Sequence, residues 1–96
     1  MKTIKEKLAI VKEVLKVEAR ELSSLKIKMK EMQRSGLGGR EQCLLRYKRH
    51  EWRHKFIAYC LVKGRTLNEI EGKCREGNEP NQQLVDRYRE EFTRND

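Results

Sequence analysis

Apolar residues recur every three or four positions from Ile4 to Met32, and this pattern is the strongest structural signal in the sequence. Glu18 is the one polar residue in the series. Spacing of this kind places side chains on one side of an α-helix, so we predict a long helix over residues 1–34. The link from Ser35 to Gly39, which contains three glycines, ends this helix and favours an antiparallel return of the chain.

The predicted long helix is more apolar in its first half than in its second. Ile10, Val14 and Val17 form a second apolar row beside the main series, and polar residues continue that row beyond Val17. A helix with two apolar rows is covered from two directions in a folded domain. We therefore expect the first half to have two neighbours and the second half to have one.

A second helix is predicted over residues 40–63. Leu45, Trp52, Phe56 and Tyr59 repeat at helical spacing and should face the first helix. Every position from Phe56 to Val62 is apolar, so we expect this end to be covered from more than one side. In an antiparallel hairpin it lies beside the first half of the long helix, which needs two neighbours for the same reason.

The rest of the chain predicts two further helices. Thr66 and Glu69 have the spacing of a capping box, which favours a short helix over residues 66–72. Pro80 suits the first turn of a last helix over residues 80–93, whose apolar face includes Val85 and Phe92. The predicted fold is all-α and forms one domain over residues 1–96. It is a long antiparallel, coiled-coil-like helical hairpin, with the short helix and the C-terminal helix packed on its open end.

Charge is high and unevenly distributed. Charged residues make up 40% of the 96 residues, and the formal net charge is +8 at pH 7. The first two thirds of the chain is cationic and the last third mildly acidic, which suggests that the cationic body meets an anionic partner. No apolar run is long enough to span a membrane, no secretory leader is visible, and the three cysteines lack a disulfide-framework spacing. We therefore expect a cytoplasmic protein that is not secreted, has no membrane partner and keeps its thiols reduced.

The densest basic cluster lies in the second predicted helix. Arg46, Arg49 and Arg53 are three and four residues apart, so they form an Arg ridge on one side of the helix. Arg is permanently charged, and its planar guanidinium can donate two hydrogen bonds to one phosphate group. The Arg ridge is therefore suited to a nucleic-acid backbone. We predict support for this contact from Lys48 and Lys55, from Tyr47 by stacking on a base, and from Lys26, Lys30, Arg34 and Arg40 at the hairpin tip.

A metal-binding pattern overlaps this cluster. His50, Glu51 and His54 match H-E-x-x-H, in which two imidazoles one helical turn apart bind zinc. Arg49 and Arg53 flank the pair, no third His follows, and neighbouring cations repel a dication. We therefore expect no metal, no other cofactor and no catalytic residue, and His50 and His54 remain the only candidate metal ligands.

The two histidines also belong to a second helical series. The other members of this series are Cys43, Tyr47, Ile57 and Leu61. One interpretation places its apolar end in the core and its His and Tyr end in solvent. The other makes the series a surface for self-association or for a partner, with imidazoles that respond to pH below about 6.5. We favour the first interpretation.

The sequence thus favours a small, basic, non-enzymatic binding protein. Our first hypothesis is that the Arg ridge binds DNA or RNA. The alternative is an adaptor or inhibitor that docks the cationic hairpin on an acidic protein surface, for example that of a nucleic-acid-processing or defence enzyme. A third hypothesis is a homodimer in which the apolar seams pair between two chains rather than within one.

Overall fold

The computed structural model describes residues 3–65 and 80–94, and these residues form three helices and no strand. Helix α1 spans Ile4–Arg34, α2 spans Gly39–Val62 and α3 spans Gln82–Thr93. The prediction of an all-α fold is confirmed. The short helix predicted over residues 66–72 lies outside the described residues.

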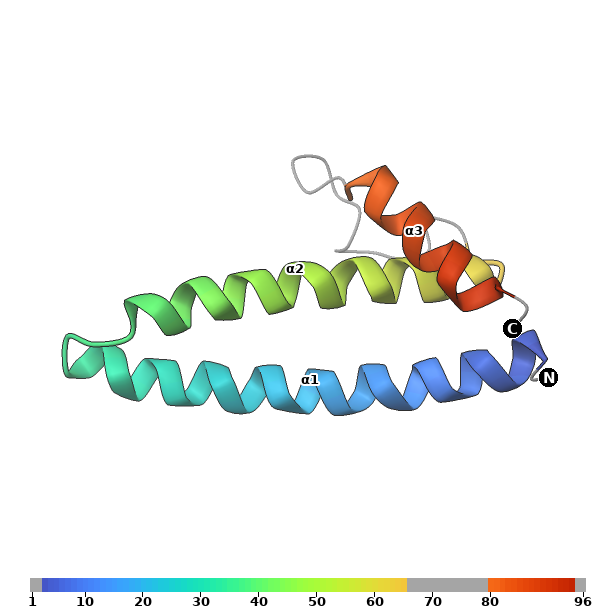
Figure 1. Ribbon diagram of the computed structural model, residues 1–96. Helices are drawn as coiled ribbons and strands as arrows, with labels where there is room; N and C mark the ends of the chain where they lie inside the picture. Colours follow the sequence, from blue (N-terminus) through green and yellow to red (C-terminus); the bar gives the residue numbers. More distant parts are fainter. Residues whose placement is uncertain (1–2, 66–79, 95–96) are drawn as a thin grey trace.

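Helices α1 and α2 lie side by side and run in opposite directions, joined by a short turn (Figure 1). Helix α3 lies over the C-terminal half of α2, close to the open end of this pair, and also contacts α1. The indole Nε1 of Trp52 donates a hydrogen bond to the Leu15 carbonyl at 2.9 Å. This bond joins α2 to the middle of α1 and helps to fix their register.

Both long helices end in the same backbone motif. At the end of α1, the Leu37 N–H donates to the Met32 carbonyl at 2.9 Å, and Gly36 has a φ of 73°. At the end of α2, the Arg65 N–H makes the equivalent bond at 3.0 Å, and Gly64 has a φ of 89°. This Schellman arrangement needs a residue with left-handed φ, which glycine adopts without strain.

Helix α3 begins two residues later than the sequence predicted. The Asn81 side chain accepts a hydrogen bond from the Leu84 N–H at 3.2 Å, so Asn81 caps the helix. Pro80 precedes this cap instead of occupying the first turn. An Asn carboxamide supplies the acceptor that the free N–H groups of a first turn require, and proline has no such group.

The core lies where the three helices meet. It is built from one central residue of α1, four consecutive residues of α2 and two residues of α3. These are Leu15, Ile57, Ala58, Tyr59, Cys60, Val85 and Phe92. Burial of four consecutive residues requires cover from more than one side, as the apolar run in this part of the sequence predicted.

The second apolar row of α1 is not buried in the core. Ile10, Val14 and Val17 remain 46%, 48% and 48% exposed. The expectation that a second neighbour covers this row is therefore wrong for the part of the chain that the structure describes. The reason is that α3 packs mainly against α2 and crosses α1 without covering the row.

Candidate nucleic-acid interface

The Arg ridge lies along one side of α2. Arg46 and Arg49 are exposed, and Arg53 is half-buried. The same helical series continues through Phe56 to Lys63, and both of these residues line a groove of about 310 Å³ between α1 and α2. The Arg ridge and this groove therefore share one side of the molecule.

Cations from both long helices line this groove, and no carboxylate of the described residues does, so we call it the basic groove. Lys12 and Lys16 come from α1, and Lys63 and Arg65 come from the end of α2. Aromatic side chains form its floor, and the Lys63 ammonium lies 5.4 Å from the centre of the Tyr59 ring. Cations over an apolar floor favour an anionic ligand, because the floor lowers the local dielectric.

Lys12 and Lys16 belong to a lysine stripe that our sequence analysis did not identify. At helical spacing the stripe continues through Ala19 and Ser23 to Lys26 and Lys30, and it contains no acidic residue. Spacing alone would have revealed it. Lys16 lies 3.5 Å from Glu13, but this pair is exposed, and such a contact adds little stability and exchanges readily for another anion.

The Arg ridge and the lysine stripe together form what we call the basic face. Its members are Lys12, Lys16, Lys26 and Lys30 of α1, Arg46, Arg49 and Arg53 of α2, and Lys63 and Arg65 at the end of α2. Two of the lysines predicted to act at the tip, Lys26 and Lys30, thus fall on the same side as the Arg ridge. Arg34 and Arg40 are exposed at the two ends of the turn.

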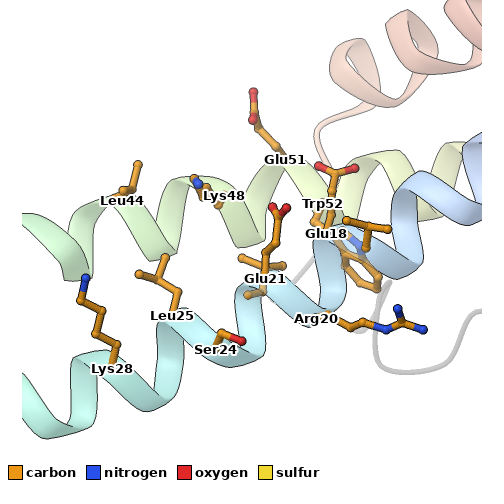
Figure 2. Close-up of a pocket in the computed structure, with 12 residues that line it drawn as sticks. Glu18, Arg20, Glu21, Ser24, Leu25, Lys28, Leu44, Lys48, Glu51 and Trp52 are labelled. Atoms are coloured by element: carbon orange, nitrogen blue, oxygen red, sulfur yellow. The ribbon is translucent and has the colours of Figure 1, made fainter.

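Lys48 lies on a different side of α2 from the Arg ridge. It lines a groove of about 610 Å³ together with three carboxylates, those of Glu18, Glu21 and Glu51 (Figure 2). Figure 2 shows Glu21 pointing from α1 towards α2, with Trp52 between the two helices. We call this the mixed groove, since cations and carboxylates are equal in number along it. Such a surface is less suited to phosphate than the basic face.

Lys55 is engaged where the three helices meet. Its ammonium lies 3.1 Å from the Glu18 carboxylate of α1 and 5.8 Å from the centre of the Tyr88 ring of α3. Burial disfavours the charged ammonium, but the hydrogen bond and the charge of Glu18 outweigh burial and raise the pKa of Lys55. Glu18, the polar residue in the apolar series, is therefore the partner of Lys55, and this contact occupies the ammonium that we predicted would support phosphate binding.

Tyr47 lies outside the basic face. Tyr47 is 61% exposed, and a hydrogen bond with Glu51 raises the pKa of its hydroxyl. Glu51 lines the mixed groove, so Tyr47 lies towards that side of α2. A base that stacked on Tyr47 would not at the same time lie along the Arg ridge.

His54 was expected at the solvated end of its series, but the structure buries it completely. Its Nε2 accepts a hydrogen bond from the Asn81 N–H at 2.9 Å, so Nδ1 carries the proton and donates to the His50 carbonyl at 2.7 Å. Burial lowers the pKa of His54 and favours this neutral form. Both ring nitrogens are thus in use, which leaves no lone pair for a metal ion.

Within residues 3–65 and 80–94, no group of three or more His, Cys, Asp or Glu side chains is placed to hold a metal ion. No described helix is both long and apolar enough to cross a membrane. No protein family model, curated protein or solved structure matches this chain.

Proposed function

We propose that this protein binds nucleic acid through phosphate contacts made by the basic face. One observation carries the proposal: the Arg ridge of α2 and the lysine stripe of α1 lie on the same side of the hairpin as the basic groove, where no described residue contributes a carboxylate. A row of cations along two long helices matches the linear charge of a nucleic-acid backbone. The proposal fits the cytoplasmic location expected from the sequence.

The proposed binding is non-enzymatic and depends weakly on base sequence. Lysine and arginine contacts to phosphate fix position and orientation but carry no sequence information. The aromatic floor of the basic groove includes Trp52, whose indole N–H is already bonded to the Leu15 carbonyl. Trp52 therefore serves as an internal fluorescent reporter, because a ligand in the basic groove changes its surroundings.

Fluorescence anisotropy of labelled DNA and RNA, titrated with nuclease-treated protein at several salt concentrations, tests the proposal. We expect an affinity that falls steeply as salt rises, because binding releases counterions. The triple variant Arg46→Ala/Arg49→Ala/Arg53→Ala should bind at least about tenfold more weakly at low salt. For duplex DNA, its slope of log affinity against log salt should be shallower by about 2 to 3, since up to three phosphate contacts are lost.

A charge-matched control separates the basic face from net charge. The variant Arg20→Ala/Lys28→Ala/Lys48→Ala also removes three cations, all from the mixed groove. We expect this control to bind nearly as well as the unaltered chain. Equal losses in the two triple variants would mean that affinity follows overall charge, and would contradict the proposal.

An acidic protein surface is the alternative partner for the same basic face, in the role of an adaptor or an inhibitor. The cations that would meet phosphates would then meet carboxylates. This alternative is favoured if no nucleic acid binds at low salt. A pull-down from nuclease-treated extract would then identify an acidic protein that the unaltered chain retains and the Arg triple variant loses.

A further inference from the structure

An apolar row on α1, on the side away from the basic face, is left uncovered by residues 3–65 and 80–94. This row consists of Ile10, Val14 and Val17, each close to half exposed. Lys12 and Lys16 are each two residues from Val14, and residues two apart point to nearly opposite sides of a helix. The apolar row and the basic face therefore serve different contacts.

Two grooves meet at this apolar row. Ile10 and Val14 line a groove of about 410 Å³ whose other wall is formed by Tyr88 and Phe92 of α3. Val17 lines the mixed groove, whose other wall is formed by α2 (Figure 2). The two grooves share Glu18, and their lining residues together extend along α1 from Lys7 to Lys28, roughly 30 Å. We call the two grooves together the depression.

The charges along this depression are nearly balanced, with five cations and four carboxylates among its lining residues. The α1–α3 groove is lined by Lys7 and Lys55 and by Glu18 and Glu91. The mixed groove likewise carries equal numbers of cations and carboxylates. Two chains of net charge +8 repel each other, and this repulsion is weakest where cations and carboxylates nearly cancel.

The apolar row is also self-complementary. Lys7 lies seven residues before Val14 and Glu21 lies seven residues after it, both in the same helical series. A twofold axis through Val14 brings Lys7 of each copy level with Glu21 of the other, roughly 10 Å along the helix on either side of the axis. It also brings Ile10 close to the level of Val17. A patch that complements itself in this way fits the isologous interface of a twofold dimer.

We propose that the apolar row is the interface of an antiparallel homodimer, in which α1 of one copy lies in the depression of the other. The main apolar seam of α1 packs within its own chain, and the second row packs between chains. Each copy keeps its basic face on the outside. The dimer thus presents two basic faces, although the proposal does not depend on what those faces bind.

Sedimentation velocity of the full chain over a wide concentration range tests the dimer. The unaltered chain should shift from the mass of one chain towards the mass of two as its concentration rises. Val14→Glu should remain monomeric over the same range, because two carboxylates would meet on the twofold axis. Val14 is exposed enough for the variant to fold, and circular dichroism verifies this.

Ile27→Glu is the matched control. Ile27 is 62% exposed on the same helix but lines neither groove, so its replacement should leave dimerisation unchanged. A monomer at every concentration would overturn the proposal, and so would a dimer that persists in Val14→Glu.

A charge exchange tests the antiparallel register. Lys7→Glu alone and Glu21→Lys alone each place like charges level with each other in a homodimer, so each variant should dimerise more weakly than the unaltered chain. Mixed together, the two variants restore opposite charges at both ends and should form a heterodimer. Failure of the mixture to associate more strongly than either variant alone would overturn this arrangement.

Discussion

His54 and Lys55 are neighbours in α2, and their surroundings fix opposite charge states. The His54 ring is fully buried and shifts towards its neutral form, which accepts the Asn81 N–H. The Lys55 ammonium remains charged despite partial burial, because Glu18 lies 3.1 Å away. At the scale of residues, both side chains belong to a dense basic cluster of the sequence, and both make contacts that hold the helices together.

The stability of the fold should depend on His54 at mildly acidic pH. Burial lowers the pKa of His54 in the folded chain, whereas the unfolded chain keeps a value near about 6.5. Between these values the unfolded state binds more protons, so the free energy of unfolding should decrease as pH falls below about 6.5. Urea unfolding followed by circular dichroism across this range measures the effect.

His54→Leu should remove most of this pH dependence. It should also cost about 1–3 kcal/mol at neutral pH, because the Asn81 N–H loses its acceptor. His50→Ala is the control, since His50 is exposed and its backbone carbonyl, which His54 uses, remains. An unchanged pH profile in His54→Leu would show that another group is responsible.

At the scale of elements, the turn between α1 and α2 depends on specific glycines. Gly38 precedes α2 with a φ of 104°, and a Cβ added there would lie 3.3 Å from the Met32 Cβ. Gly39 is the first residue of α2, and a Cβ added there would meet nothing within 4 Å. The two glycines are adjacent in sequence but differ in what they contribute to the turn.

Gly38→Ala and Gly39→Ala should therefore have different effects on thermal stability. Gly38→Ala should destabilise the fold by about 1 kcal/mol or more, because a side chain is strained at positive φ and crowds Met32. Gly39→Ala should be neutral or stabilising by about 0.5 kcal/mol, because alanine restricts the unfolded chain and favours helix. Thermal denaturation of the two variants measures the difference, and similar midpoints would contradict the role given to Gly38.

At the scale of the whole molecule, one polar contact joins all three helices. The Lys55 ammonium bridges Glu18 of α1 and the Tyr88 ring of α3, beside the apolar core. The side chains of Lys55 and Glu18 are only 26% and 28% exposed, so solvent screens this pair less than a surface pair. The junction of the three helices is thus held by an ion pair as well as by apolar packing.

Lys55→Met should destabilise the fold by about 1–3 kcal/mol, since it leaves the Glu18 carboxylate half-buried without its partner. The same variant should change nucleic-acid affinity much less than the Arg triple variant, because Lys55 lies outside the basic face. Urea unfolding and anisotropy on one protein sample measure both quantities. Lys48→Met is the control and should leave stability nearly unchanged, because Lys48 is exposed.

Much of the fold could be predicted from the sequence, because the deciding interactions are local. Helical spacing predicts α1, α2 and the Arg ridge, and the φ requirement of a helix end predicts stops at Gly36 and Gly64. The lysine stripe was equally readable from spacing. Spacing within one helix does not show which side of the molecule a stripe occupies after the helices pack. For this reason the basic face as a whole was not predicted.

The sequence by itself determined that this chain is helical, basic and divided by glycines, since each of these properties depends only on neighbouring residues. Only the tertiary structure decided that His54 is buried, that Lys55 is paired with Glu18, and that the apolar row stays exposed. The pairing of Lys55 depends on the register of α1 against α2, and the other two depend on where α3 crosses α2. That crossing is fixed by packing between residues far apart in the chain. The spacing of residues along one helix does not predict such packing.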